Sequence, residues 1–260
     1  MIPSDNVQYL DKNFWEKRYT NNDNNHVTRE WLGDYSLFCD YFRQNVSKSL
    51  SILILGCGNS LLSEQLFQDG YENIHNIDIS STVIKTMSEH CDKCKQMKWS
   101  TMDCRRLDFI DETFDVVIEK ATLDVFLVQE KSSWNISNEA LQSLRPIGHE
   151  IYRVLRKNSG QFFSITFSAP HFRHPLFGKM FDNNLKIKNI EQLGNEFHFF
   201  LYHLTNDPSI RESVSCFQYE PPIQIDIKND GQVFRTSLFW SHDFDNFYVE
   251  FLSFFKSEIN

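Results

Sequence analysis

The feature that most constrains this chain is an apolar strand that runs directly into a glycine-rich turn. Residues 52–55 are all apolar and do not alternate with polar residues, which is typical of a parallel strand covered on both faces. Gly56, Cys57, Gly58 and Asn59 follow at once, and a helical pattern begins near Ser60. Glycines at such a turn let the backbone approach a ligand, and the helix N-terminus offers free N–H groups. The segment therefore predicts a ligand site at one edge of an open α/β sheet.

The middle of the chain alternates strand and helix patterns, as in a parallel sheet with helices on its faces. We expect strands at residues 51–55, 73–79, 98–102, 114–119, 161–168 and 196–204. We expect helices over about 60–70, 81–91 and 139–155, with Pro146 marking a kink or a boundary. The predicted fold class is therefore α/β, with a doubly wound and mostly parallel sheet.

The two ends of the chain have weaker patterns. Residues 1–45 are aromatic-rich, and we expect them to form a separate N-terminal segment before the α/β domain at 46–260. Within that domain, residues 205–239 are expected to be an irregular insertion, because they hold Pro208, Pro221, Pro222 and a turn at 229–231.

The charge balance disfavours nucleic acid as a partner. Lys and Arg total 26 against 35 Asp and Glu, and a net charge of −9 has the wrong sign for neutralising phosphates. The first residues lack the apolar core of a signal peptide, and no apolar run reaches the ~20 residues of a membrane span. We therefore expect a cytoplasmic monomer with no membrane association.

The cysteines and histidines do not predict a metal site. Six cysteines in a chain without a signal peptide are expected to be reduced thiols. Cys91 and Cys94 form a CxxC pair, but no second ligand pair stands at a suitable spacing. His198 and His203 fall on opposite faces of an expected strand, so we expect structural roles for them and no metal.

Two carboxylates mark the same sheet edge as the glycine turn. Asp78 ends the second expected strand, about 20 residues after Gly56, where a carboxylate accepts the ribose hydroxyls of an adenosine cofactor. Asp103 follows the third strand, where it can accept from the adenine amino group while Cys104 offers its backbone amide. The third glycine of dinucleotide-binding turns is missing after Asn59, which disfavours a pyrophosphate. A sulfonium ligand with a methionine-like tail, as in S-adenosylmethionine, fits better.

Six segments occur in order along the chain: ILILGCGNSLLSEQLFQDGY, NIDIS, STMDCRRLDF, FDVVIEKATLDVFL, FSAPHFR and FHFFLY. Over about residues 9–203 the chain resembles the seven-strand methyltransferases that modify lysine in translation elongation factor 1-alpha. The resemblance implies a Rossmann-like seven-stranded fold, S-adenosylmethionine as cofactor, and protein-lysine N-methylation with elongation factor 1-alpha as the substrate.

The resemblance also implies which residues bind the cofactor. They are Gly56, Gly58 and Asn59 in the turn, Asp78 and Ile79 at the ribose, Asp103 and Cys104 at the adenine, and Lys120 after the fourth strand. The first residues resemble the family's FW-x-x-R-Y and W-x-G-x-Y segments, which would place Trp15, Tyr19 and Trp31 over the cofactor as a lid. Aromatic faces attract a sulfonium through cation–π interaction.

The chain departs from the usual patterns at two positions. Ile54 stands where most methyltransferases have an acidic residue, and Ala121 stands where the family usually has glycine. Alanine fits at 121 unless the position needs a positive φ angle.

An amine must be neutral to attack a methyl sulfonium, and an apolar pocket that desolvates the ammonium lowers its pKa. Asp124, Trp134, His171 and Phe172 follow the fourth and fifth strands and are candidates for this acceptor site, with Asp124 and His171 as the catalytic candidates. Two alternatives stay open, because a fold does not settle function. One is methylation of a small molecule, and the other is a cofactor-binding partner subunit without activity.

Overall fold

The computed structural model describes residues 5–20, 28–91, 94, 96–130, 136–194 and 199–210, and the backbone of two further strands at 223–229 and 232–238. The chain divides into two compact units, one reaching residue 213 and the other covering 214–260.

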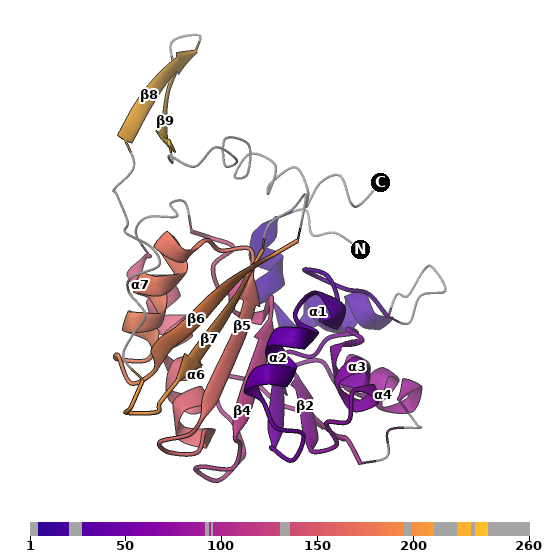
Figure 1. Cartoon of the computed structure of the whole chain (residues 1–260). Coiled ribbons are helices and arrows are strands. Elements are labelled where there is room, and N and C mark those ends of the chain that lie inside the picture. The colour runs from indigo at the N-terminus through magenta and orange to yellow at the C-terminus, as the bar shows by residue number, and fades with distance from the viewer. Residues whose placement is uncertain are drawn as a thin grey trace. The chain divides into compact units, whose positions relative to one another are not determined.

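The first unit is built on a seven-stranded sheet with the order β3-β2-β1-β4-β5-β7-β6 (Figure 1). In chain order the strands are β1 (Ile52–Leu55), β2 (Ile74–Asp78), β3 (Lys98–Thr101), β4 (Val116–Lys120), β5 (Gln161–Thr166), β6 (Lys186–Leu193) and β7 (Phe199–Thr205). The first five strands run parallel, and β7 lies antiparallel between β5 and β6. The strand order therefore reverses between β1 and β4, which is where open α/β sheets bind ligands. The predicted α/β fold class is confirmed.

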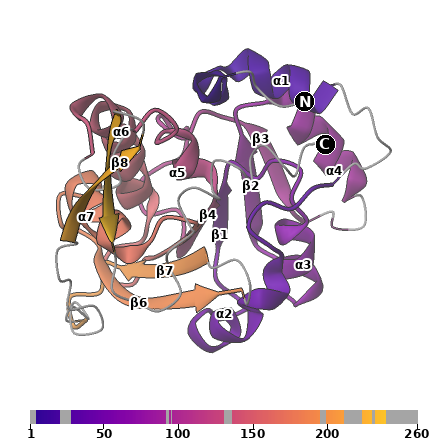
Figure 2. The same ribbon diagram turned by 90° about the horizontal axis from the view of Figure 1, so that it is seen from above.

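Helices cover both faces of this sheet (Figure 2). On one side lie α2 (Cys39–Asn45), α3 (Leu62–Gln68) and α4 (Ser81–His90), and on the other lie α5 (Thr122–Val125), α6 (Asn138–Val154) and α7 (Pro170–Met180). Ile52 and Ile54 belong to the core that holds Phe42 and Leu66, and successive strand residues point to opposite faces. All four residues of β1 are at most 2% exposed, which explains the apolar run without alternation.

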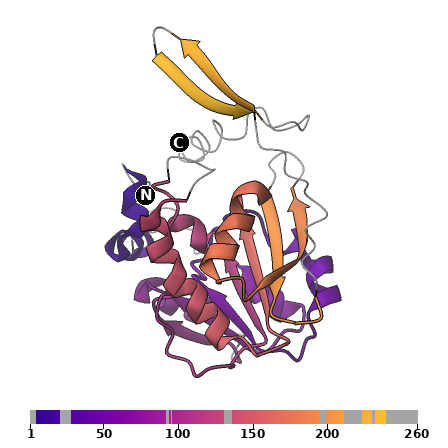
Figure 3. The ribbon, with the colours of Figure 1, turned by 90° about the vertical axis from the view of Figure 1, so that its left-hand side faces the viewer.

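The two helices α6 and α7 pack closely on their side of the sheet (Figure 3). Gly148 makes this possible, because a Cβ there would stand 2.2 Å from the backbone carbonyl oxygen of Met180. Pro146 lies inside α6 and does not end it, so of the two expected roles, a kink or a boundary, it is not a boundary. The apolar face formed by Leu144, Ile147 and Ile151 is fully buried, and this packing stabilises a helix that lacks one backbone donor.

The N-terminal segment forms η1 (Asn6–Leu10), α1 (Lys12–Thr20) and η2 (Tyr35–Leu37) before α2. Helix α1 lies beside α4 (Figure 2). The Tyr35 backbone N–H donates to the Gln65 side chain of α3 at 3.1 Å, and its hydroxyl donates to Asp69 at 2.7 Å. Residues 28–45 therefore pack directly on the helices that cover the sheet.

Several elements differ from the sequence-based expectations. Strand β4 begins at Val116 instead of residue 114, because Phe114 forms an isolated bridge to Leu155. Strand β6 and helix α7 were not predicted. The region expected to be irregular at 205–239 contains an antiparallel hairpin of β8 (Ile223–Asn229) and β9 (Gln232–Leu238), which join across the expected turn.

Strand β7 carries His203, which is fully buried. Its Nδ1 atom lies 2.9 Å from the Tyr41 hydroxyl oxygen, and its ring stacks on Phe163 with centroids 4.2 Å apart. This is the structural role expected for His203. His198 lies outside the described residues.

Candidate functional site

The glycine turn after β1 has the backbone geometry that only glycine adopts easily. Gly56 and Gly58 have φ angles of +59° and +50°. A Cβ on Gly56 would stand 2.4 Å from Thr122 Oγ1, and one on Gly58 would stand 3.0 Å from the Tyr19 hydroxyl oxygen. The Thr122 hydroxyl donates to the Leu55 carbonyl at 2.9 Å and so ties the start of α5 to the turn.

Asp78, the last residue of β2, holds this turn from the side. Its Oδ2 accepts the Gly58 N–H at 2.9 Å and its Oδ1 accepts the Ser80 N–H at 2.9 Å. Burial raises the pKa of Asp78 to about 6, although these backbone N–H groups favour the ionised form. Each carboxylate oxygen can accept a second hydrogen bond. The structure therefore brings Asp78 and both glycines together at the predicted edge.

Asp103 and Cys104 follow β3, the neighbour of β2. The Met102 N–H donates to the Asp78 carbonyl at 2.8 Å and joins the two strand ends. Arg105 donates from its backbone N–H to Asp103 at 2.9 Å and from its guanidinium Nη2 at 2.6 Å. Burial alone would raise the pKa of Asp103, but these bonds lower it. Arg105 was missed by the sequence reasoning, and its place two residues after Asp103 is the signal that could have found it.

Aromatic rings from the N-terminal segment reach the glycine turn. Trp15 and Tyr19 stack with centroids 5.9 Å apart, and the Tyr19 hydroxyl lies beside Gly58. The Arg18 guanidinium carbon lies 5.9 Å from the centroid of the Trp15 ring and 5.2 Å from that of Trp31, within range of cation–π attraction to both. The structure thus places Tyr19 beside the turn, with Trp15 stacked on it and Trp31 on the other side of their shared contact with Arg18.

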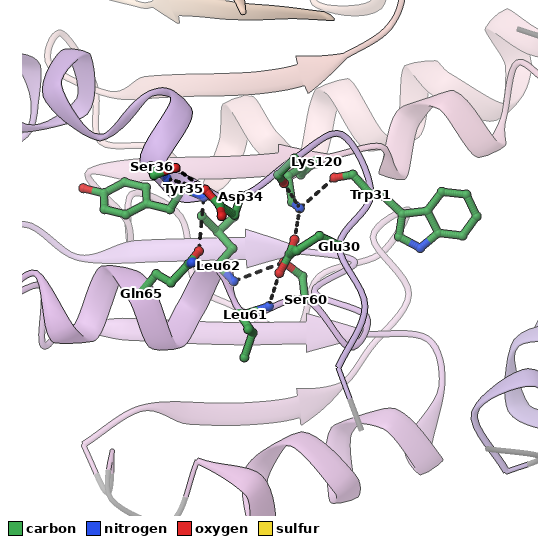
Figure 4. A network of polar contacts seen from close by, with 11 residues as sticks. Glu30, Trp31, Asp34, Tyr35, Ser36, Ser60, Leu61, Leu62, Gln65 and Lys120 are labelled. Carbon is green, nitrogen blue, oxygen red and sulfur yellow. Dashed lines mark hydrogen bonds and ion pairs between the residues drawn. The ribbon is translucent and has the colours of Figure 1, made fainter. Parts of the chain in front are cut away.

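Lys120 attaches this segment to the sheet (Figure 4). Its side chain is 5% exposed, and its ammonium group donates to the Glu30 carboxylate, to the Trp31 carbonyl at 2.8 Å and to the Gly33 carbonyl at 3.1 Å. Glu30 also accepts the Ser60 hydroxyl at 2.9 Å. Burial lowers the pKa of Lys120, and Glu30 opposes that shift.

Glu30 lies at the centre of this attachment, and the sequence reasoning missed it. Its carboxylate accepts the Leu61 N–H at the start of α3 at 2.5 Å, and the neighbouring Arg29 N–H donates to the Asn59 carbonyl at 3.0 Å. Glu30 directly precedes Trp31 in the W-x-G-x-Y segment, which is the signal that could have found it.

Glu16 makes a second attachment, between α1 and the start of α4. It accepts the Ser81 N–H at 2.9 Å, the Thr82 N–H at 3.2 Å and the Ser80 hydroxyl at 2.8 Å. Burial would raise the pKa of Glu16, but these hydrogen bonds together lower it to about 2. Because Ser80 follows Asp78 closely, α1 is fixed next to the ribose candidate.

The acceptor candidates lie beyond β4. Asp124 in α5 accepts one hydrogen bond from the guanidinium of Arg173 at 2.6 Å and another from the Thr166 hydroxyl at 2.6 Å. Burial lowers the pKa of His171 to about 4, so its imidazole is neutral at pH 7. Phe172 is 8% exposed and therefore packs mainly in the core. Trp134 lies outside the described residues.

The described residues show neither a metal-binding cluster nor a membrane-spanning helix. Among them, no three His, Cys, Asp or Glu side chains gather as a metal site would require. No helix in the described part of the chain has the length and apolar character to cross a membrane.

Comparison with known proteins gives consistent results. A family described as "Methyltransferase domain" matches residues 53–163. EEF1A lysine methyltransferase 4 of Mus musculus is 35% identical over 203 residues, which cover 78% of each chain. The Bos taurus protein of the same name is 34% identical over 85% of this chain and 86% of its own. The eEF1A lysine and N-terminal methyltransferase of Homo sapiens is 33% identical over 66% of this chain and 23% of its own.

Solved structures show the same fold. N-methyltransferase NodS from Bradyrhizobium japonicum WM9, in complex with S-adenosyl-L-homocysteine, aligns with a TM-score of 0.55 at 14% identity over 77% of this chain and 98% of its own. The PH0226 protein from Pyrococcus horikoshii OT3 aligns with a TM-score of 0.50 at 19% identity over 65% of this chain and 87% of its own. The fold is therefore that of Rossmann-like S-adenosylmethionine-dependent methyltransferases.

Proposed function

Because the chain belongs to the EEF1A lysine methyltransferase 4 family, an S-adenosylmethionine-dependent methyltransferase family, we propose that it methylates the ε-amine of a lysine in translation elongation factor 1-alpha. The observation that carries the proposal is 35% identity across 78% of both chains. The reaction belongs in the cytoplasm, where this substrate acts.

The residues at the glycine turn fit the cofactor. Gly56, Gly58 and Asn59 would hold the methionyl part, since positive φ angles and absent Cβ atoms let the backbone approach it. Asp78 and Ile79 would hold the ribose, because the Asp78 carboxylate can accept a ribose hydroxyl besides the Gly58 and Ser80 N–H groups.

The remaining candidates complete the cofactor site. Asp103 and Cys104 would hold the adenine at the end of β3. Residues 1–45 would act as the lid, with Trp15, Tyr19 and Trp31 over the cofactor and Lys120 holding the segment in place through Glu30. A closed aromatic lid excludes water from the methyl group, which protects it and strengthens electrostatic contacts in the site.

The bound cofactor supplies an activated methyl group on a sulfonium, so the chain needs only to position and desolvate the amine. Asp124 and His171 are the candidates for orienting the acceptor lysine. His171 is neutral at pH 7 and does not repel an incoming ammonium group, because burial lowers its pKa to about 4. Desolvation beside aromatic side chains would lower the pKa of the lysine and increase its neutral fraction.

The test uses the full chain, purified elongation factor 1-alpha and cofactor with a labelled methyl group. We expect label on one or more lysines of the factor, located by peptide mass spectrometry, and none with Asp78→Asn. Label found only in a small-molecule fraction of a cell extract would contradict the proposal in favour of a small-molecule enzyme. Cofactor binding by calorimetry without any label would contradict it in favour of a partner subunit.

A further inference from the structure

A buried group of charged side chains lies next to the acceptor candidates, between β4, α5 and α7. Glu119 and Arg173 are fully buried, and the Asp124 side chain is 22% exposed. Arg173 Nη2 donates to Asp124 Oδ1 at 2.6 Å and to the Thr166 hydroxyl at 2.5 Å. The Ser168 hydroxyl donates to the same Asp124 oxygen at 3.4 Å. We call Glu119, Asp124 and Arg173 the buried charge cluster.

The hydrogen bonds of Glu119 hold the cluster to the backbone of α5. Glu119 accepts the N–H groups of Thr122 at 3.0 Å and Leu123 at 3.1 Å, and it accepts the Ser164 hydroxyl from β5. The backbone that carries Asp124 is therefore fixed by Glu119.

The cluster has unused hydrogen-bonding groups. Arg173 Nε and Nη1 and Asp124 Oδ2 are buried and have no hydrogen-bond partner among the described residues. An unpaired buried polar group is destabilising, and more so when it is charged, so such groups are rare in a purely structural network. Asp124 Oδ2 in particular needs a donor that these residues do not supply.

With Glu119 ionised, the cluster holds two carboxylates against a single guanidinium. Burial raises the pKa of Glu119, Arg173 opposes that shift and Asp124 adds to it. The other titratable groups here do not supply a cation. Burial raises the pKa of Tyr202 well above its ordinary value, and burial keeps His171 neutral at pH 7 by lowering its pKa to about 4.

The position of the cluster connects it to the cofactor turn. Thr122, two residues before Asp124, would be in contact with any side chain at Gly56. Thr166 is the last residue of β5 and lies at the carboxyl edge beside β4. Asp124 is thus placed at the carboxyl edge beside the turn, and although its Oδ2 atom is buried, its side chain as a whole is 22% exposed.

We infer that the buried charge cluster recognises the cationic amine of the acceptor, with Asp124 as the contacting residue and Arg173 as the positioning residue that holds it. This rests on the proposed function, because it needs an amine acceptor. An ammonium group at Asp124 Oδ2 supplies the missing donor, and its positive charge pairs with the carboxylate. Arg173 fixes the carboxylate through one atom, Nη2, which donates to both Asp124 and Thr166.

The test compares Asp124→Asn, Arg173→Ala and Arg173→Lys with the parent chain on elongation factor 1-alpha. We expect the KM for the factor to rise about 30-fold or more in Asp124→Asn, the loss typical of a truncated buried charge pair, with the cofactor Kd unchanged. Arg173→Ala should raise the KM in the same way with the cofactor Kd unchanged, and millimolar guanidinium should restore part of its activity. Arg173→Lys keeps the charge but not the guanidinium group, and we expect intermediate losses.

Arg153→Ala is the matched control, because Arg153 also joins carboxylates, those of Glu150 and Asp111, but lies outside the cluster. It should leave the KM unchanged and show no rescue. An unchanged KM in Asp124→Asn, with the parent chain active, would overturn the inference alone. A parent chain that binds cofactor but labels no amine would overturn the proposed function and the inference with it. If Arg173→Ala does not fold, Asp124→Asn and Arg173→Lys still decide the matter.

Discussion

The ion pair between Lys120 and Glu30 offers a direct test of how the N-terminal segment is attached. We consider Lys120→Met, which keeps the length of the side chain and removes its charge, and Glu30→Gln, which keeps the shape of the carboxylate. Lys120 is 5% exposed and makes three hydrogen bonds, while Glu30 is 22% exposed and keeps Ser60 and Leu61 as donors without Lys120.

These contacts set the expected magnitude. Removing one partner of a buried ion pair costs about 3–5 kcal/mol of stability. Because Ser60 and Leu61 still donate to Glu30, we expect Lys120→Met to lie at the low end of this range, at about 3 kcal/mol. Glu30→Gln should cost about 2 kcal/mol, since hydrogen bonds to charged groups contribute roughly 1.5–3 kcal/mol each. Because the two side chains share one interaction, the double variant should cost about 3 kcal/mol and the coupling energy should be about 2 kcal/mol.

The assay is amide hydrogen exchange, because the variants should destabilise the attachment of the N-terminal segment to the rest of the unit and not the whole fold. The Arg29 and Leu61 N–H groups donate across the attachment, and in Lys120→Met they should exchange roughly 100-fold faster, as a change of about 3 kcal/mol implies. The Ile54 amide in β1 serves as the control and should keep its protection. A change below about threefold at Arg29 and Leu61, or a coupling energy under about 0.5 kcal/mol, would refute the reasoning.

Three further predictions follow from single positions. Ala121 has a φ angle of +62°, so Ala121→Gly should stabilise the fold by about 1 kcal/mol, measured as a higher midpoint of urea unfolding. Gly148→Ala should destabilise it by about 2 kcal/mol or more in the same assay, because the new Cβ would meet the Met180 carbonyl at 2.2 Å. Burial raises the pKa of Asp78 to about 6, and ribose hydroxyls need its ionised form. Cofactor affinity measured by calorimetry should therefore fall as the pH drops below 6, while Asp78→Asn should bind weakly at every pH; a parent profile flat down to pH 5 would contradict this.

The sequence predicted the parts of the fold that depend on local pattern. The apolar run of β1, the glycine turn and the carboxylate at the end of β2 were readable because each is set by residues close together in the chain. The helix α7 was missed because its apolar and polar residues do not separate onto two faces, and Pro175 stands inside it. Strand β6 was missed because its burial does not alternate regularly and a bulge interrupts its register.

The candidate site was predictable to the same extent. Asp78 and Gly56 follow from spacing, whereas Glu30, Glu16 and Arg173 act through partners that lie far away in the sequence. The change from glycine to Ala121 looked small from the sequence, but the structure shows a left-handed backbone there and hence strain.

The attachment of the N-terminal segment has a consequence for biosynthesis. Glu30 pairs with Lys120, which lies 90 positions later in the chain, and Tyr41 contacts His203, which lies 162 positions later. On the ribosome, Glu30 and Tyr41 are therefore made well before these partners. During translation, the attachment through Glu30 can form only after β4 has been made, and the contact of Tyr41 only after β7 has been made.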